Sequence, residues 1–384
     1  MTFEQISTFD VLYDAYLTAR KGKRKKTSTA QYEANALQCT EKLAYILRTK
    51  KYVPSKFETF FVFEPKKRLV QAPAFVDKVV LHAITDNVMY EALTKSFIRD
   101  NHASQKGKGT HDGVLRLKGH MIDFYRKNRT TDGWVLKGDV RHFFASIDHD
   151  LLKSKLWDVV VKRNVDPQIY DLLCTYIDTT EGLPLGYQTS QLLALMFLDE
   201  FDHLVKEKYQ IRYYGRYMDD FYAILPTKKE AQNLLKKISE YMASVKLELN
   251  QKTGIFPLRN GIDFLGFHTY LTETGGVVQK LRRDSIQRMR SKTKFWAKAY
   301  PAGEVSKKQI IDSFRAWDAH AAHGDTYSLR LKYAKKISEI IGEEIRPKRK
   351  INSTEKIADM RKAAQARKAV RKKMEAELSA SIPF

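Results

Sequence analysis

Cysteine is scarce in this chain of 384 residues, and long apolar runs are missing from it. Its two cysteines, Cys39 and Cys174, cannot form the disulfide framework of a small secreted domain, and they do not have the number or spacing of zinc ligands. The sequence has no apolar run of about 20 residues that would predict a transmembrane helix, and it shows no signal peptide. We therefore expect a cytoplasmic protein without a membrane partner.

Negative charge is also in short supply. Lys and Arg together number 68 against 45 Asp and Glu, which gives a formal net charge of +23, and 43% of the residues are hydrophobic. The apolar content suffices for a sizeable core, so we expect one multi-lobed body rather than independent modules. A positive surplus of this size is typical of proteins that bind nucleic-acid backbones. A dense basic run at 20–26 has two interpretations, a solvated loop or a nucleic-acid contact.

The most informative segment is 211–225, where two runs rich in Ile, Tyr, Phe and Leu flank Asp219 and Asp220. These residue types favour strands, so the segment predicts a β-hairpin with two carboxylates at its tip. A solvated Asp-Asp turn is the simpler interpretation of the segment alone. The alternative is a cation site, because two adjacent carboxylates repel each other and their oxygens suit Mg²⁺ or Mn²⁺.

A second carboxylate in a similar setting favours the cation site. Residues 134–140 read as a strand that carries Asp139 near its end, and a helix containing Phe143 and Phe144 follows. An acidic strand end beside an Asp-Asp hairpin can hold two metal ions about 4 Å apart, which is the geometry of in-line phosphoryl displacement.

Both segments resemble motifs of reverse transcriptases. Tyr217-Met218-Asp219-Asp220 resembles their YxDD box, and Asp139 followed five residues later by Phe144 resembles the first motif of their palm. The resemblance spans about residues 50–330. It implies an α+β, right-hand polymerase with fingers, a palm made of an antiparallel sheet plus helices, and a helical thumb.

The expected organisation has five parts. These are an N-terminal helical basic extension at 1–50, fingers at 51–133, a palm at 134–275 that includes fingers-side helices at 150–195, a thumb at 276–345, and a basic C-terminal helical tail at 346–384. The tail has few large apolar residues, so we expect it to form or dock against RNA or a partner protein.

Helical periodicity predicts further helices at 30–50, 77–94 and 227–249. In the thumb it places Ile286, Met289 and Phe295 on the packed face. In the segment that begins with Trp317, His320 and His323 have the i, i+3 spacing of a metal pair, but packing is the favoured interpretation.

For the chemistry, the resemblance implies a two-metal polymerase that adds dNTPs to a primer on an RNA template. Asp139, Asp219 and Asp220, with the backbone carbonyl of Val140, would bind two Mg²⁺ or Mn²⁺ ions, and Asp220 would be the weaker ligand. Lys252 occupies the place of the lysine thought to protonate the departing pyrophosphate. An ordinary loop lysine is the alternative interpretation of Lys252.

The resemblance also implies nucleotide contacts. Lys66 and Arg68, with Lys67 as an alternative to Lys66, lie at the tip of a predicted hairpin and would grip the incoming triphosphate. Phe144 would be the steric gate that rejects a ribose 2′-hydroxyl. Phe143 would then belong to the core, although the two phenylalanines could exchange these roles.

A loop before the catalytic hairpin indicates the subfamily. Many reverse transcriptases have Gln-Gly-x-x-x-Ser-Pro there, whereas this chain has Leu185 and Gln191 in place of the Gln and the Pro around Gly186. This pattern resembles the reverse transcriptases of diversity-generating retroelements, relatives of the group II intron enzymes, which copy a template RNA with frequent errors at adenines. A leucine offers only shape contact where a glutamine can hydrogen-bond, which relaxes discrimination. Tyr187-Gln188 departs from the Asn-Leu common in that family, and antiphage defence enzymes carry similar boxes.

Template and primer contacts are implied in four segments. They are Lys106 and Lys108 of a Gly-rich segment, Tyr217 and Met218 of the YxDD box, Leu265 and Gly266 of a hairpin that holds the primer 3′ end, and Arg282 and Arg283 at the start of the thumb. The Gly-rich segment lacks the glycine spacing of a P-loop, so it does not indicate an NTPase.

The expected partners are a template or noncoding RNA, the DNA product, dNTPs, and either a small accessory protein or a second copy of the chain. Two alternatives stay open. One is a defence-associated reverse transcriptase that copies its own noncoding RNA or synthesises DNA without a template. The other is an inactive RNA-binding scaffold, against which the intact Asp139, Asp219 and Asp220 argue.

Overall fold

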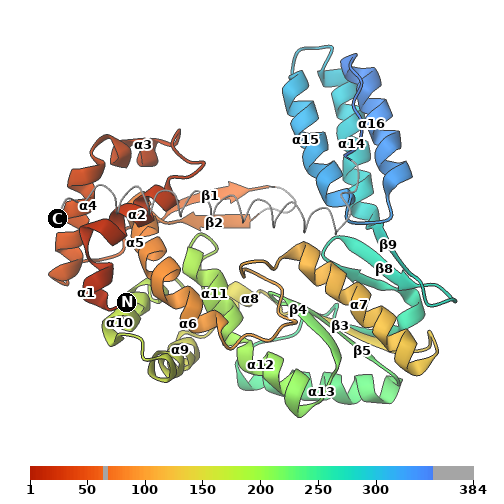
Figure 1. The fold of residues 1–384 in the computed structure, drawn as a ribbon, viewed down its shortest axis with the longest axis horizontal. Coiled ribbons are helices and arrows are strands. Elements are labelled where there is room, and N and C mark those ends of the chain that lie inside the picture. The colour runs from red at the N-terminus through yellow and green to blue at the C-terminus, as the bar shows by residue number, and fades with distance from the viewer. Residues whose placement is uncertain (64–67, 349–384) are drawn as a thin grey trace, which may run out of the picture. The chain divides into compact units, whose positions relative to one another are not determined.

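The structure is a computed structural model that describes residues 1–63 and 68–348 (Figure 1). The predicted hairpin-tip residues Lys66 and Lys67, the side chain of Arg68, and the predicted basic tail beyond 348 lie outside the described residues. The chain divides into two units. The first comprises Met1–Leu265 and Thr269–Val277, and the second comprises Gly266–His268 and the chain from Val278 onward.

The N-terminal segment of the first unit is helical. It forms α1 (Phe3–Ile6), α2 (Phe9–Ala19), α3 (Thr27–Ala34) and α4 (Ala36–Arg48). The single helix predicted at 30–50 is wrong, because Asn35 has φ −127° and ψ 38° and separates α3 from α4. In the basic run between α2 and α3, Arg20 and Arg24 both donate to the carboxylate of Glu33, at 2.7 Å and 2.5 Å.

The predicted hairpin after these helices is present. Its strands β1 (Glu58–Val62) and β2 (Arg68–Ala72) pair antiparallel in a two-stranded sheet. The helix predicted at 77–94 is also present, as α5 (Phe75–Ile84), a π-helical turn (Thr85–Met89) and α6 (Tyr90–Thr94). A longer helix, α7 (Thr110–Asn128), then leads to the central sheet.

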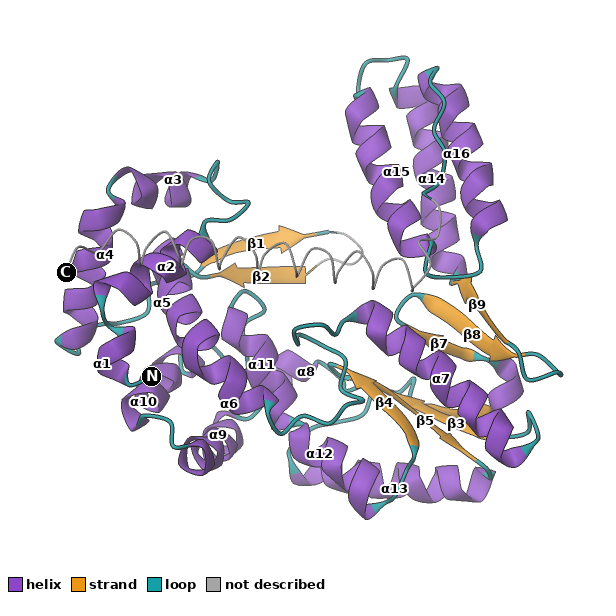
Figure 2. Ribbon diagram, in the orientation of Figure 1, coloured by secondary structure: helices purple, strands orange, loops and turns teal. Residues whose placement is uncertain are grey.

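The central sheet has four antiparallel strands in the order β4-β5-β3-β6. Their bounds are β3 (Trp134–Gly138), β4 (Tyr213–Tyr217), β5 (Asp220–Leu225) and β6 (Gly254–Pro257). Figure 2 shows α7 and α13 (Lys228–Ser244) on opposite sides of this sheet. Alternation explains the two layers, because Tyr213 packs in the cluster that includes α7, whereas Tyr214 packs in the cluster that includes α13.

Helices also connect β3 to β4. They are α8 (Phe143–Ser146), α9 (His149–Arg163), α10 (Pro167–Ile177), α11 (Gln188–Phe197), α12 (Asp199–His203) and a π-helical turn (Leu204–Lys208). Asp148 is the N-cap of α9, since its Oδ1 accepts a hydrogen bond from the Leu151 amide at 3.0 Å, as expected of an Asp that opens a helix. Thr227 caps α13 in the same manner, in a capping box with Glu230.

A third sheet has the order β7-β8-β9, with β7 (Ile262–Phe264), β8 (Phe267–Leu271) and β9 (Val277–Leu281), and a short 3₁₀ helix (Leu258–Asn260) precedes it. The division into two units runs through this part of the chain.

Up to residue 348, where its described part ends, the second unit has three helices around a core of its own. They are α14 (Arg283–Ala299), α15 (Lys307–Ala321) and α16 (Tyr327–Ile341). The predicted packed face of α14 is wrong at one residue, because Phe295 is 54% exposed whereas Trp296 is buried. Trp296 lies seven residues after the buried Met289, so it continues the same helical stripe. Trp317 packs edge-on against Tyr333, which agrees with the packing interpretation of that segment.

Both cysteines are free, as expected. The prediction of a mixed helix-and-sheet fold is confirmed. The finer assignment of fingers, palm and thumb, and the five-part division of the chain, stay predictions. Among the residues that the structure describes, none of the helices has the length and apolar character needed to cross a membrane.

Candidate active site

The turn between β4 and β5 carries the first candidate carboxylate. Tyr217 and Asp220 pair across the two strands, so Met218 and Asp219 form a two-residue turn. The expectation that both carboxylates occupy the tip is therefore wrong in one detail, since Asp220 is the first residue of β5. Met218 has φ +56°, in the left-handed region that non-glycine residues seldom adopt. The local pattern predicted the hairpin, but only the strand register decided which residues turn.

Asp139 lies next to this hairpin because β3 pairs with β5. The last register pair, Gly138 with Phe221, sets the following residue, Asp139, beside Asp220. The Asp139 carbonyl accepts a hydrogen bond from the Asn250 amide at 2.8 Å, which fixes the end of the strand. The structure thus brings together the acidic strand end and the hairpin that the sequence indicated separately.

The electrostatics of the carboxylates differ. Burial raises the pKa of Asp219, and the negative charge of Asp139 raises it further. The carboxylate of Asp220 instead pairs with the ammonium of Lys137 on β3. No three His, Cys, Asp or Glu side chains of the described residues are arranged to hold a metal ion as they stand. The mutual repulsion of Asp139 and Asp219 nevertheless fits a cation, which would relieve it.

The candidate steric gate, Phe144, lies against the loop on which the prediction of a subfamily rests. The Leu183 amide donates to the Phe144 carbonyl at 2.7 Å, and Gly182 of the same loop has φ +61°. A Cβ added at Gly182 would lie 2.4 Å from that carbonyl oxygen, so only glycine permits so close an approach. Phe143 is buried, whereas Phe144 is partly exposed, so Phe143 is the core residue of the two.

The next residues of the loop line a hollow of about 320 Å³. Leu185 is 44% exposed there, and the Gln191 Oε1 accepts a hydrogen bond from the Ser104 hydroxyl at 2.5 Å. Gly186 lies against the backbone of β2, because an added Cβ would lie 1.9 Å from the Gln71 carbonyl oxygen. The residues lining the hollow are Lys23, Pro73, Lys78, Leu81, His82, Leu185, Gly186, Tyr187, Gln188 and Gln191. Three candidate nucleotide-binding residues therefore share one hollow with two lysines.

The three candidate lysines within the described residues, Lys106, Lys108 and Lys252, have different surroundings. The ammonium of Lys108 donates to the carbonyls of Ile98 and Asn101, at 3.2 Å and 2.9 Å, so it holds its own loop together. The ammonium of Lys106 lies 4.7 Å from the ring centroid of Tyr90. Lys252 is exposed, in a turn that follows the segment bonded to Asp139.

Of four further candidate residues, Leu265 belongs to the first unit, and Gly266, Arg282 and Arg283 belong to the second. Leu265 and Gly266 form the turn between β7 and β8 with φ +50° and +88°, and positive φ at both positions is typical of a tight hairpin. Within the second unit, the Arg282 amide donates to the Gly266 carbonyl at 3.1 Å. Arg283 is exposed at the first residue of α14.

The sequence interpretation missed one pair of residues near the site, Arg216 and Asp202. Both are fully buried, and their side chains form an ion pair at 2.5 Å. Arg216 stands in a strand of aromatic residues, and a charged residue at such a position is rarely buried unless it is paired. The charged Arg216 among aromatic residues was therefore the sequence feature that could have indicated a buried ion pair.

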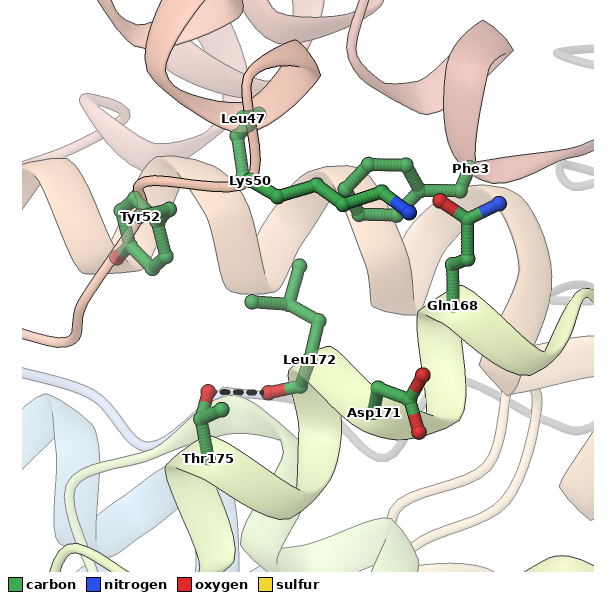
Figure 3. A pocket seen from close by; sticks show the side chains of 8 residues that line it. All are labelled: Phe3, Leu47, Lys50, Tyr52, Gln168, Asp171, Leu172 and Thr175. Carbon is green, nitrogen blue, oxygen red and sulfur yellow. Dashed lines mark hydrogen bonds between the residues drawn. The ribbon is translucent and has the colours of Figure 1, made fainter.

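A separate hollow of about 160 Å³ contains none of the candidate residues (Figure 3). It is lined by Phe3, Leu47, Lys50, Tyr52, Gln168, Asp171, Leu172 and Thr175. The Thr175 hydroxyl is bonded to the Leu172 carbonyl at 2.7 Å, as the dashed line in Figure 3 shows. The acidic strand ends are therefore the better candidate site.

Comparison with known proteins agrees with the motifs. Residues 63–269 match the family model of the reverse transcriptase (RNA-dependent DNA polymerase). Because this match covers more than half of the chain, the chain belongs to the reverse transcriptase family.

The chain is similar to Protein YkfC of Escherichia coli (strain K12), with 25% identity over a match that covers 52% of this chain and 62% of that protein. It is also similar to apo telomerase from Candida tropicalis (12% identity, TM-score 0.47, 77% of this chain and 60% of that chain). A third similar structure is telomerase from Candida albicans in complex with a fragment of telomeric RNA (11% identity, TM-score 0.45, 85% of this chain and 68% of that chain). The chain thus spans about three fifths of the length of the first two relatives.

Proposed function

We propose that this protein is an RNA-directed DNA polymerase that adds dNTPs to a primer 3′ end. The observation that carries the proposal is the pairing of β3 with β5, which sets Asp139 beside the Asp219-Asp220 hairpin in a chain of the reverse transcriptase family. Carboxylates gathered on neighbouring strand ends suit phosphoryl transfer by two metal ions.

In this proposal Asp139, Asp219 and Asp220, with the backbone carbonyl of Val140, would hold two divalent cations, Mg²⁺ or Mn²⁺. Such cations, when bound, activate a hydroxyl nucleophile and neutralise charge on the transferring phosphoryl group. The ammonium of Lys137 forms an ion pair with the Asp220 carboxylate, so it would leave that carboxylate when the cations bind. Lys252, which is exposed two residues after the Asn250 bonded to Asp139, would give a proton to the departing pyrophosphate.

The nucleotide would contact both the ring of Phe144 and the part of the following loop that carries Leu185 and Gly186. The partly exposed ring of Phe144 would exclude a ribose 2′-hydroxyl, which favours dNTPs. Leu185 and Gly186 would contact the nucleotide by shape, and Gln191 would lie beside them. On the fingers hairpin, Lys66 and Arg68 would bind the triphosphate.

Template and primer would be bound by residues outside the acidic centre. They are Lys106, Lys108, Tyr217, Met218, Leu265, Gly266, Arg282 and Arg283. The net charge of +23 supports nucleic-acid partners, because basic surfaces gain affinity by releasing counterions from phosphate backbones. We also propose that the protein is of the diversity-generating type and copies its template RNA with low fidelity. The exposed, apolar Leu185 supports this finer assignment, since it cannot make the hydrogen bonds of a glutamine.

The test uses purified protein, a primed RNA template, Mg²⁺ and each dNTP in turn. We expect template-directed extension by the wild type and none by the Asp219→Ala/Asp220→Ala variant. Asp158→Ala is the matched control, because Asp158 is exposed on α9, and it should extend the primer like the wild type. Errors concentrated opposite adenine would support the diversity-generating type, and an even error spectrum would contradict it.

A cognate RNA would be required if the generic template failed. RNA that co-purifies from the native host then serves as the template. A chain that extends neither template, yet binds RNA, would be the inactive scaffold, and the proposed function would be abandoned. Extension without any template would favour the defence-associated alternative.

A further inference from the structure

A buried ion pair lies beneath the turn that carries Asp219. Neither Arg216 of β4 nor Asp202 of α12 has exposed surface. Two nitrogens of the guanidinium donate to the two carboxylate oxygens of Asp202, Nε to Oδ1 at 2.7 Å and Nη2 to Oδ2 at 2.5 Å. The third nitrogen, Nη1, donates to the carbonyl oxygen of Met218 at 2.7 Å. The guanidinium therefore joins a helix to the peptide group that directly precedes Asp219.

The ion pair is itself held from several sides. The Tyr214 hydroxyl donates to Asp202 Oδ1 at 2.6 Å, and strand alternation puts Tyr214 and Arg216 on the same face of the sheet. The backbone of Arg216 is also engaged, because its amide donates to the Asp100 carbonyl at 2.9 Å and its carbonyl accepts from the His102 amide at 3.0 Å. The Arg216 guanidinium is therefore held in one orientation relative to the turn.

The turn needs such a support, because its first residue is in an unfavourable conformation. Met218 has φ +56°, where the Cβ of an L-residue crowds the backbone. Conformations of this kind persist where the surroundings impose them. A charged donor on the Met218 carbonyl fixes the plane of the peptide between Met218 and Asp219. That plane sets the direction in which the Asp219 side chain leaves the backbone.

We infer that Arg216 and Asp202 are positioning residues that aim the Asp219 carboxylate at the reacting centre through the carbonyl of Met218. For its catalytic consequence, the inference rests on the proposed function. Arg216 is not a catalytic residue, because its buried guanidinium is already bonded to Asp202 and Met218. Lysine cannot replace it, since an ammonium is a point charge without the planar fork that serves both partners at once.

The test compares two conservative variants of buried arginines. Arg216→Lys removes the fork beneath the turn. Arg330→Lys is the matched control, because Arg330 is also buried and donates to both oxygens of Asp318, at 2.8 Å and 3.2 Å, in the second unit. All assays are run on the full chain at a temperature below the melting of both variants, so that loss of folded protein does not enter.

The expected results for Arg216→Lys are specific to the hairpin. Amide hydrogen exchange should become faster in the peptide that covers 213–225. The kcat for dNTP addition should fall about 100-fold, as expected of a displacement of about 1 Å, while KM for the dNTP changes less than about threefold. The Mn²⁺ concentration for half-maximal binding, measured by electron paramagnetic resonance, should rise about tenfold. Arg330→Lys should change none of these three quantities.

A rescue variant tests whether the Met218 carbonyl transmits the effect. Glycine takes positive φ without strain, so Arg216→Lys should lower kcat about tenfold less in a Met218→Gly background than in the wild type. Met218→Gly alone is the reference for the double variant, which accounts for the loss of the proposed template contact of Met218. A purely structural role of Arg216 predicts no recovery. No recovery would therefore overturn the proposed route through Met218.

Failure of the inference and failure of the proposed function give different results. If the wild type polymerises but Arg216→Lys keeps its kcat and its hairpin exchange, or Arg330→Lys shows the same losses, the inference is wrong. If the wild type does not polymerise, the proposed function fails, and exchange and Mn²⁺ binding decide the inference. Faster exchange and weaker Mn²⁺ binding in Arg216→Lys alone would support it, and unchanged values would overturn it.

Discussion

The close approach of Gly186 to β2 yields a quantitative prediction. A Cβ built at residue 186 lies 1.9 Å from the Gln71 carbonyl oxygen, and real Cβ atoms essentially never come within 3.0 Å of another heavy atom. In Gly186→Ala, either the loop or the strand must therefore move by about 1 Å. Gln71 lies in the hairpin strand that begins at Arg68, whereas Gly186 follows Leu185. Whichever side moves, two segments proposed to hold one nucleotide lose their relative position.

The expected magnitudes follow from that displacement. Insertion of a methyl group into so tight a contact costs about 1–3 kcal/mol of unfolding free energy. A misplacement of about 1 Å at a reacting group costs up to about 100-fold in rate, so we expect kcat/KM for dNTP addition to fall about 10- to 100-fold in Gly186→Ala. Single-nucleotide extension on a primed RNA template measures kcat and KM, and urea denaturation measures the stability.

Gly119→Ala is the matched control for this substitution. Gly119 lies within α7, where an added Cβ meets nothing within 4 Å, so alanine should leave the kinetics unchanged and stabilise the helix by about 0.5–1 kcal/mol. Wild-type kinetics and wild-type stability in Gly186→Ala would refute the reasoning, because they would mean that the loop does not lie against Gln71.

Two further predictions concern stability. Burial opposes ionisation of the Asp112 carboxyl, but hydrogen bonds from Arg99 and His102 outweigh it and hold the pKa of this group at about 2. The carboxylate therefore contributes about 2 kcal/mol of unfolding free energy, which is fully present above about pH 4 and is lost as the pH falls toward 2. In urea denaturation, Asp112→Asn should be less stable than the wild type by this amount at pH 7, and a deficit that does not shrink below pH 4 would contradict the assignment. In the second unit, Asp318→Ala leaves the Arg330 guanidinium buried without its carboxylate, so the unfolding free energy should fall by about 3–5 kcal/mol. A loss under about 1 kcal/mol in the same assay would show that the pair is not buried in solution.

Local sequence patterns sufficed for much of the site. Runs of strand-favouring apolar and aromatic residues predicted β3, β4 and β5, and the placement of Asp139 and Asp219 at their ends follows from where each run stops. Such patterns are readable because strand period and turn composition are properties of a few consecutive residues. Helical periodicity likewise predicted the amphipathic helix that follows Thr227, which depends on residues within a few turns.

Strand register and helix phase were harder to predict from the sequence. The sequence placed both carboxylates at the hairpin tip, whereas the pairing of Tyr217 with Asp220 puts only Asp219 in the turn. It also placed Phe295 in the core of the second unit, although Phe295 is exposed and Trp296 is buried there. Each error is a shift of one residue. Adjacent residues of similar hydrophobicity differ little in local preference, so the packing partner decides between them.

Motif residues and their order along the chain were enough to identify the family of this protein and its acidic strand ends. Only the tertiary structure showed that Arg216 and Asp202 form a buried pair under the hairpin, and that the backbone of Gly186 meets that of Gln71. Contacts of this kind join segments that are separate in sequence, and neither periodicity nor composition records which segments will meet. Their energies depend on burial and close packing, which exist only after the chain has folded.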